Sequence, residues 1–288
     1  MKALVTGAGG QLARVWAAAA PQGWDVTSLA RADLDVGDEA AVDGAVAALR
    51  PDLILNAAAY TAVDRAESEP DLAFRINGDG AGHLARAAVA NGARLIHVST
   101  DFVFDGRAGT PYRPDSPTAP LGVYGASKLA GEIAVASAAP DALIVRTAWV
   151  YGAVGANFLN TMLRLMGSRP ELGVVADQIG TPTSTATLAA ALWALFDADA
   201  KGIWHFTDAG AASWYDFAQA IAEEAVSAGL LASAPVVKPI TTADYPTPAP
   251  RPGYSVLDKT AAYALLGRPA PHWRASLRNE LSLLKACV

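Results

Sequence analysis

The chain has 288 residues, of which 52% are hydrophobic and 17% are charged. This composition excludes a disordered chain and leaves room for one large or two modest domains. The net charge of −6 argues against a nucleic-acid partner, since DNA- and RNA-binding proteins carry an excess of positive charge. We find no apolar run near the roughly 20 residues of a membrane span and no signal-peptide core. We therefore expect a cytoplasmic protein with no nucleic-acid or membrane partner.

Cys287 is the single cysteine, so an internal disulfide cannot form. A chain without disulfides is typical of a reducing compartment. This agrees with the expected cytoplasmic location.

The first two-thirds of the chain alternate short apolar runs with alanine-rich amphipathic stretches. The apolar runs predict buried strands at residues 4–5, 26–29, 53–55, 95–98 and 143–145. The stretches between them predict helices at residues 11–20, 39–50, 73–90 and 124–137. This alternation predicts right-handed βαβ units and a parallel sheet covered on both faces. Ligands bind beyond the carboxyl ends of such strands, which draws attention to Gly7, Arg31, Asn56, Ser99, Thr100, Asp101, Arg146 and Thr147.

The pattern loosens after about residue 150. Residues 157–166 and 188–196 predict helices, and residues 203–206 predict a late strand. Four prolines between residues 246 and 252 mark an extended loop before the C-terminal helices. We predict an α/β fold: a Rossmann-type, doubly wound parallel sheet at residues 1–150 and 178–207. A smaller, mixed α/β substrate-binding cap is predicted from residues 151–177 and 208–288.

A glycine-rich segment, residues 6–13, follows the first strand and opens the first helix. Its small residues let the backbone turn tightly and approach a pyrophosphate, whose charge the helix N-terminus favours. Glycines also occur in such turns for their conformational freedom alone, but the position inside a βαβ series favours a dinucleotide site. We predict a cofactor site formed by Gly7, Gly9, Gly10, Gln11, Leu12, Arg31, Asp35, Val36, Ala57, Ala58, Ala59, Tyr124 and Lys128.

Arg31 follows the second strand, where an acidic residue would hold the ribose hydroxyl of NAD. An arginine at this place can accommodate the 2′-phosphate of NADP instead. Arg31 therefore favours NADPH. Asp33 or Asp35 can still reach the adenosine, so NADH stays an alternative.

Tyr124 and Lys128 are four residues apart at the start of a predicted helix, so they share one face. A free phenol has a pKa of about 10, and a nearby lysine cation lowers it towards useful proton transfer. Thr100, just past a predicted strand, can hydrogen-bond the same substrate oxygen. The pair alone is common by chance. Together with the glycine loop, it predicts a catalytic group of Thr100, Tyr124 and Lys128.

These segments resemble the dTDP-4-dehydrorhamnose reductase family, within the extended short-chain dehydrogenase/reductase superfamily, over essentially the whole chain. The tyrosine–lysine pair is shared across the superfamily. The segments around Ser99-Thr100-Asp101, Trp149 and Arg251-Pro252 are more specific to the reductases. The full set of matching segments covers residues 6–12, 56–67, 99–106, 124–132, 146–152, 177–183 and 251–255.

The resemblance implies a nicotinamide-dependent reduction of a 4-keto-6-deoxy sugar nucleotide, the last step to dTDP-L-rhamnose. Tyr124 would protonate the C-4 oxygen as hydride reaches the carbon, Lys128 would hold the nicotinamide ribose, and Thr100 would orient the carbonyl. Arg251 would neutralise the diphosphate. The implied substrate site consists of Val63, Asp64, Thr100, Asp101, Phe102, Tyr124, Trp149 and Arg251.

Three places depart from the family pattern. Ala13 replaces the usual third glycine, and Phe102 stands where a tyrosine is frequent. Some relatives form metal-bridged dimers through a carboxylate on the first helix, but residues 14–16 offer none. The four histidines also lack metal-ligand spacing. We therefore expect no metal, and a monomer or a homodimer.

Two other functions fit parts of the same pattern. The first is a sugar-nucleotide epimerase or dehydratase, which recycles a tightly bound NAD+. The second is a non-catalytic nucleotide-binding protein, like the regulatory subunit of methionine adenosyltransferase. The intact pair of Tyr124 and Lys128 argues against a purely binding role, because binding alone does not require both side chains.

Overall fold

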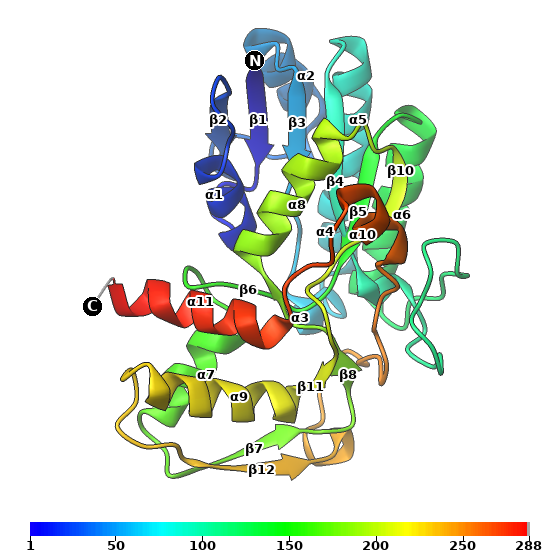
Figure 1. The fold of residues 1–288 in the computed structure, drawn as a ribbon. Helices are drawn as coiled ribbons and strands as arrows, with labels where there is room; N and C mark the ends of the chain where they lie inside the picture. The colour runs from blue at the N-terminus through cyan, green and yellow to red at the C-terminus, as the bar shows by residue number, and fades with distance from the viewer. Residues whose placement is uncertain (287–288) are drawn as a thin grey trace.

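Six parallel strands form the central sheet of the computed structural model, which describes residues 1–286. Cys287, and the prediction that rests on it, lie outside the described residues. The strand order is β10-β5-β4-β3-β1-β2, and every neighbouring pair is parallel (Figure 1). The strands are β1 (Lys2–Thr6), β2 (Asp25–Leu29), β3 (Leu53–Asn56), β4 (Arg94–Thr100), β5 (Leu143–Thr147) and β10 (Gly202–His205).

The chain runs outward from β1 to β2 and then returns past β1 to β3. The strand order therefore reverses beside β1, and a crevice at the carboxyl end of such a reversal is where doubly wound sheets bind ligands. The predicted Rossmann-type fold is confirmed. Its glycine loop lies at this switch point, because it directly follows β1.

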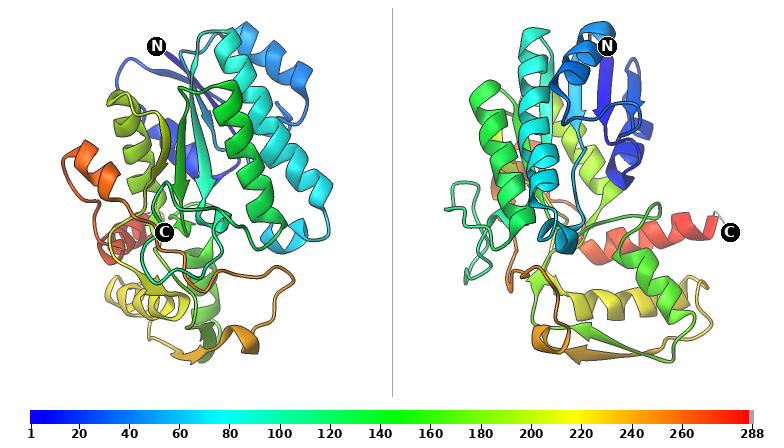
Figure 2. Two further views of the ribbon diagram at one scale, coloured as in Figure 1. Left: turned by 90° about the vertical axis from the view of Figure 1, so that its right-hand side faces the viewer. Right: turned by 180° about the vertical axis from the view of Figure 1, so that it is seen from behind.

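Helices cover both faces of the sheet (Figures 1 and 2). One face carries α1 (Gln11–Ala18), α8 (Thr185–Asp197) and the short α10 (Thr260–Leu266). The other face carries α2 (Glu39–Leu49), α5 (Gly80–Ala90) and α6 (Val123–Ala138). Successive strand residues point to opposite faces, so that Leu53 and Leu55 join the first core while Ile54 joins the second. This two-sided burial explains why an inner strand such as β3 is apolar at successive positions.

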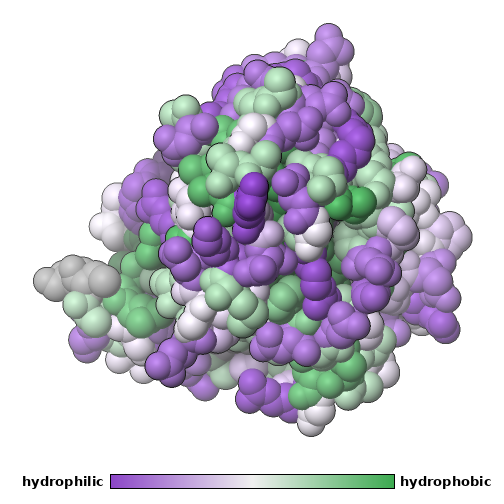
Figure 3. Space-filling model, turned by 90° about the horizontal axis from the view of Figure 1, so that it is seen from above, coloured by the Kyte–Doolittle hydropathy of each residue, from purple (hydrophilic) through white to green (hydrophobic). Residues whose placement is uncertain are grey.

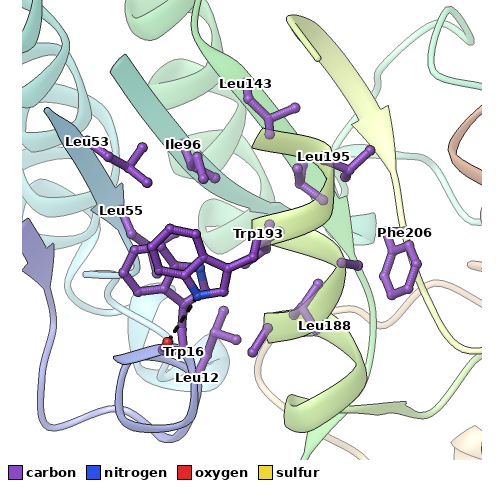
Figure 4. Close-up of a cluster of buried hydrophobic side chains, with 14 of the residues drawn as sticks. Leu12, Trp16, Leu53, Leu55, Ile96, Leu143, Leu188, Trp193, Leu195 and Phe206 are labelled. Carbon is purple, nitrogen blue, oxygen red and sulfur yellow. Dashed lines mark hydrogen bonds between the residues drawn. The ribbon is translucent and has the colours of Figure 1, made fainter. Parts of the chain in front are cut away.

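Two buried tryptophans fix α1 against α8. The rings of Trp16 and Trp193 stack with centroids 4.0 Å apart, and Trp193 Nε1 donates to the Trp16 carbonyl at 3.2 Å (Figure 4). Because the glycine loop runs directly into α1, this contact also holds the direction in which the N-terminus of α1 points.

The helix predicted at residues 73–90 is interrupted in the structure. It consists of α4 (Pro70–Phe74), a π-helical turn, η1 (Arg75–Asp79), and α5. The widened turn contains Asn77, whose side chain accepts from Tyr60 N–H at 2.8 Å and donates to Tyr60 O at 3.1 Å. Asn77 also donates to the Ser127 hydroxyl at 3.0 Å. A π-turn of this kind often marks a functional region, and here it ties the loop after β3 to α6.

A second layer lies beyond the carboxyl ends of the six strands (Figure 1). Its core lies among α7 (Phe158–Met166), α9 (Trp214–Ser227), α11 (Trp273–Ala286) and the parallel pair β7 (Glu171–Val175) and β12 (Val236–Ile240). Shorter elements join the layers: α3 (Val63–Ala66), η2 (Asp101–Val103), β6 (Val150–Tyr151), β8 (Ile179–Gly180), β9 (Thr183–Ser184), β11 (Ala212–Ser213) and η3 (Thr242–Asp244). Neither β7 nor β12 was predicted, because both are half-exposed and are interrupted by Gly173 or Pro239.

Hydrophilic and hydrophobic residues are interspersed on the surface at the opposite end of the molecule (Figure 3). Within residues 1–286, no helix combines the length and the apolar character needed to cross a membrane.

Candidate active site

The glycine loop packs closely against the loop that follows β3. Gly7 has a φ of +75°, and a Cβ at this position would lie 2.8 Å from backbone atoms of Ala58. Gly10 N–H donates to Gly7 O at 2.8 Å, which closes the turn, while a Cβ on Gly9 would meet nothing within 4 Å. Helix α1 then starts at Gln11 without a side-chain cap, so its first N–H groups are free to face an anion. The loop therefore fits a pyrophosphate.

Gln11 and Leu12 differ in what they can offer a cofactor. The Gln11 side chain donates to Val150 O at 2.9 Å and accepts from Asn157 Nδ2 at 3.0 Å, which links α1 to the second layer. The Leu12 side chain is buried in the core, so only its backbone can reach a ligand. Ala13 is buried as well, in agreement with close helix–strand packing at the usual third glycine.

Asp35 is already engaged by an arginine. Its carboxylate accepts from Arg75 Nη1 at 3.0 Å and from Gly37 N–H at 3.0 Å. Burial raises the pKa of Asp35, but these two hydrogen bonds outweigh it and hold the pKa below its ordinary value. Arg31 lies exposed nearby and lowers the same pKa further. Two arginines thus surround the acid beside the end of β2, which suits a phosphate on the adenosine ribose. Val36, predicted with them, is buried.

Thr100 and Tyr124 come together where β4 ends and α6 begins. Thr100 Oγ1 donates to Asp101 Oδ1 at 2.9 Å and accepts from Phe102 N–H at 3.2 Å. A Cβ on Gly125 would lie 2.2 Å from Phe102 O, so α6 can approach this segment only with glycine there. The rings of Phe102 and Tyr124 also pack edge to face, 5.4 Å apart. These contacts press Tyr124 onto the segment after β4.

Burial raises the pKa of Tyr124 to about 12, although a hydrogen bond with Thr100 lowers it, and the Asp101 carboxylate raises it further. Lys128 is not among the groups that shift this pKa. The expectation that the lysine cation lowers the pKa of Tyr124 is therefore wrong for this structure. Tyr124 is fully protonated at neutral pH, which is the form that a proton donor requires.

Lys128 is buried, and its Nζ donates to Val98 O in β4 at 2.7 Å. Burial lowers the pKa of Lys128 to about 8, while the Glu132 carboxylate raises it. The ammonium is thus mostly charged at neutral pH but lies close to its titration range.

A cavity of about 610 Å³ opens beside these residues. Four predicted substrate residues line it, namely Asp64, Phe102, Trp149 and Arg251. Asp101 is buried behind Thr100, and Val63 begins α3 next to Asp64. Thr100 and Tyr124 are not part of the lining themselves, but Phe102 contacts both. The structure therefore places the predicted substrate residues around one region.

Arg251 and Asp64 form an ion pair at the cavity. Arg251 Nη2 donates to both carboxylate oxygens of Asp64 at 2.9 Å, and Nη1 donates to Ala249 O at 3.0 Å. The Arg251 side chain is 20% exposed and that of Asp64 is 42% exposed. A guanidinium held this way stays available to an anionic ligand.

Trp149 has a positive φ of +48°, which is uncommon for a bulky residue. Its ring stacks on Trp214 with centroids 3.5 Å apart, and a Cβ on Gly180 would lie 2.5 Å from it. The sequence analysis did not identify Trp214, the first residue of α9, as the stacking partner of Trp149. The signal was present, because Ser213 and Asp216 form a capping box that places Trp214 at a helix start.

Ala57, Ala58 and Ala59 form the half-exposed loop against which Gly7 packs. Arg146 and Thr147 lie within β5 and are buried, and Arg146 is paired with Glu132. No group of three or more His, Cys, Asp or Glu side chains that could hold a metal ion is found within residues 1–286.

Comparison with known proteins identifies chains that resemble this one over nearly its whole length. The family model described as the RmlD substrate binding domain matches residues 1–285. A dTDP-4-dehydrorhamnose reductase of Streptomyces griseus is 47% identical, over 98% of this chain and 93% of that protein. The solved dTDP-4-dehydrorhamnose reductase of Clostridium acetobutylicum superposes with a TM-score of 0.93 at 40% identity, covering 99% of this chain and 100% of that one. The reductase of Bacillus anthracis, solved in complex with NADP, has a TM-score of 0.91 at 37% identity, covering 97% and 98%.

A doubly wound sheet with a glycine loop at its switch point, and with tyrosine and lysine one helical turn apart, defines an enzyme of the extended short-chain dehydrogenase/reductase class. Within this class the assignment is narrower, since relatives above 40% identity span nearly the whole chain. The chain belongs to the dTDP-4-dehydrorhamnose reductase family.

Proposed function

We propose that this protein reduces dTDP-4-dehydro-6-deoxy-L-mannose (4-keto-rhamnose) to dTDP-L-rhamnose with NADPH. The observation that carries the proposal is the packing of Tyr124 on Phe102, which follows Thr100 closely and lines the cavity. The names of the relatives support the substrate, and the NADP bound to the Bacillus anthracis relative supports the cofactor.

The residues around the switch point fit a bound NADPH. The backbone of Gly7, Gly9 and Gly10 would face the pyrophosphate, and Arg31 would face the 2′-phosphate. When bound, the nicotinamide supplies the hydride. Lys128 bonds to β4, whereas Arg31 follows β2, and β1 lies between these two strands in the sheet. This separation suits a role of Lys128 at the nicotinamide ribose.

Tyr124 acts as the acid in this proposal. It gives its proton to the C-4 oxygen, and the raised pKa guarantees that the proton is present before reduction. Thr100 is held in one orientation by Asp101 and by Phe102 N–H. Turning the Thr100 hydroxyl proton from Asp101 towards the substrate oxygen would let it orient the carbonyl. Lys128 does not shift the pKa of Tyr124, so its proposed role is at the nicotinamide ribose alone.

The cavity residues bind the rest of the substrate. Arg251 would exchange its bonds to Asp64 for bonds to the diphosphate, since a guanidinium binds phosphate oxygens in the same forked geometry. Phe102 and Trp149 offer apolar surfaces to the deoxysugar, and Asp64 can accept from its hydroxyl groups.

We assign the cofactor and the substrate to different parts of the chain, the sheet with its helices and the second layer. Residues 1–150 and 178–207 would bind the dinucleotide, and residues 151–177 and 208–288 would bind the substrate. The separate core around α7, α9 and α11 supports this division. Helix α10 is an exception: it belongs to the second range by sequence, but it packs on α8 and β10 of the first.

The proposal is tested by following NADPH absorbance with dTDP-4-dehydro-L-rhamnose as the acceptor. We expect turnover in the wild type and a loss on the order of a hundredfold or more in Tyr124→Phe. Tyr215→Phe, which makes the same change within the second layer, should keep the wild-type rate. Equal rates in wild type and Tyr124→Phe would remove Tyr124 as the proton donor.

Two results would favour the alternatives. Stoichiometric NAD+ in the purified protein, without net oxidation of NADPH, would indicate an epimerase or a dehydratase. Absence of turnover, combined with co-purification of a synthetase, would indicate a binding subunit instead.

A further inference from the structure

A buried ion pair lies behind the catalytic residues. Arg146 in β5 donates from Nε to Glu132 Oε1 at 2.9 Å and from Nη2 to Glu132 Oε2 at 2.7 Å. Both side chains are only 3% exposed. The Ser99 hydroxyl donates to Glu132 Oε1 as well, at 2.5 Å. Both oxygens of the Glu132 carboxylate therefore accept hydrogen bonds, although the side chain is buried away from solvent.

Glu132 also lies one helical turn after Lys128, on the same face of α6. Both residues bond to neighbouring positions of β4, because Lys128 reaches Val98 O and Glu132 receives the Ser99 hydroxyl. The next residue of β4 is Thr100. Helix α6 is thus fastened to β4 at two consecutive residues, immediately before the residue that contacts Tyr124.

We propose that Glu132, held by Ser99 and Arg146, is a positioning residue that acts through Lys128 and keeps it charged beside the end of β4. The inference deepens the proposed function, on which the catalytic importance of Lys128 rests. Glu132 touches neither substrate nor cofactor in this proposal, so it acts through Lys128.

The groups around Lys128 support this role. On its own helix it has Tyr124 and Glu132. On β4 it has His97, which is buried, and whose pKa is held well below its ordinary value by burial and by Lys128 itself. His97 is therefore neutral, and Glu132 supplies the negative charge that opposes the burial of the ammonium.

The charged groups on the helices that pack against α6 do not replace the effect of Glu132 on the pKa of Lys128. None of them is among the groups that shift the pKa of Lys128. Arg75 and Arg86 are themselves paired, with Asp35 and Glu39. The groups in question on α3, α4, η1 and α5 are Asp64, Arg65, Asp71, Arg75, Asp79, His83 and Arg86.

Arg146 stabilises the Glu132 carboxylate and does not remove the effect of this carboxylate on Lys128. Its Nη1 donates to Pro114 O at 3.1 Å, and its guanidinium lies 5.1 Å from the centre of the Phe104 ring. These contacts hold the guanidinium against Pro114 and Phe104, and Glu132 is the one charged group that shifts the pKa of Lys128. A buried carboxylate without such a partner would bind a proton and lose its effect on Lys128.

The test reads the charge of Lys128 directly, without catalysis. The chain has six lysines, so [ε-13C]lysine NMR of the full-length protein gives few signals: Lys2, Lys128, Lys201, Lys238, Lys259 and Lys285. The spectrum of Lys128→Arg assigns the signal of Lys128. In the wild type this signal should titrate at about pH 8. In Glu132→Gln we expect the midpoint to move down by about one unit, because the opposite charge that raises the pKa of Lys128 is lost.

A matched control and a second variant complete the test. Glu39→Gln makes the same change in the exposed pair with Arg86 and should leave the midpoint of Lys128 unchanged. Glu132→Gln combined with Arg146→Met removes both buried charges and avoids an unpaired guanidinium, so it remains informative if the single variant does not fold. The double variant should show the same downward shift.

An unchanged midpoint in the double variant overturns the proposal. A shift in the single variant alone overturns it too, since the unpaired Arg146 would then be the cause. Because NMR reads the charge in the absence of substrate, a failure of the proposed function is recognised separately, by the lack of turnover. If turnover is present, the alkaline decline of kcat/KM should move to lower pH in Glu132→Gln, whereas a purely structural role would lower the rate without moving it.

Discussion

Two of the arginine–carboxylate pairs of this protein differ in burial more than in bonding. Arg146 donates two bonds to Glu132 on α6, and Arg251 donates two bonds to Asp64 at the cavity. The first pair is 3% exposed on both sides, whereas the side chains of the second are 20% and 42% exposed. The same chemical pair therefore serves a fixed arrangement in one region and an exchangeable one in the other.

The difference follows from solvation. A buried charge that loses its partner has no water to replace it, so the pair is costly to break. A solvent-exposed pair gains little free energy, because water competes for both charges. Arg251 can consequently leave Asp64 for a ligand, while Arg146 has no such freedom. The following predictions test this contrast, beginning with the largest expected effect.

The loss of one partner should lower the free energy of unfolding much more for the buried pair than for the exposed pair. We expect Arg146→Met to lower the free energy of unfolding by about 3–5 kcal/mol, since Glu132 is left buried and unpaired. Asp64→Asn should lower it by less than about 1 kcal/mol. Urea denaturation followed by circular dichroism measures both. Similar losses in the two variants would show that burial does not distinguish the pairs.

Asp208 provides a buried carboxylate without an arginine. Burial raises its pKa to about 6, and its Oδ1 has no hydrogen-bond partner. The folded protein therefore binds this proton more readily than the unfolded chain does, and the residue reduces stability above pH 6, with relief as the pH falls through 6 towards 4. Asp208→Asn should raise the free energy of unfolding at pH 7.5 by about 1–3 kcal/mol.

The gain from Asp208→Asn should shrink when the urea denaturation is repeated at pH 4.5, where the wild-type carboxyl is protonated in the folded state. A gain of the same size at both pH values would mean that the charge of Asp208 is not responsible.

Arg251→Gln should affect binding rather than chemistry. The loss of charge-assisted hydrogen bonds to a diphosphate raises KM by about tenfold or more, with kcat nearly unchanged. Steady-state kinetics with the 4-keto sugar nucleotide measures both parameters. A fall in kcat with constant KM would place Arg251 at the reacting centre instead.

The last prediction concerns the wild-type pH profile, where the expected change near pH 8 is only about twofold. Because burial lowers the pKa of Lys128 to about 8, its ammonium is lost as the pH rises through that value. If the charged form is required, kcat/KM should fall to about half near pH 8 and by about tenfold for each further unit. A flat profile up to pH 10 would mean that the charge of Lys128 is dispensable.

Local patterns in the sequence predicted much of the sheet, and the catalytic group proposed from them stays a prediction. The strand–helix alternation, the glycine loop and the spacing of Tyr124 and Lys128 each depend on neighbouring residues, which a sequence displays directly. The late strand at residues 203–206 was also found, close to the observed β10.

Contacts between distant segments were harder to predict. The pairing of β7 with β12 joins residues more than sixty positions apart, and neither strand is apolar enough to stand out. The pKa of Tyr124 depends on burial that no spacing rule contains. One clue was present, because Arg146 interrupts the apolar strand Leu143–Thr147, and an arginine in such a strand requires a buried partner.

The order of the strands has a consequence for synthesis of the chain. Strand β5 occupies an inner position of the sheet, but its outer neighbour β10 is made only after β6 to β9 and α8. At about 5–20 residues per second, the ribosome leaves the apolar edge of β5 unpaired for several seconds. An exposed edge of this kind can pair with another nascent chain. We therefore expect release of a chain that stops before β10 to yield aggregates, whereas one that continues through β10 can close its sheet.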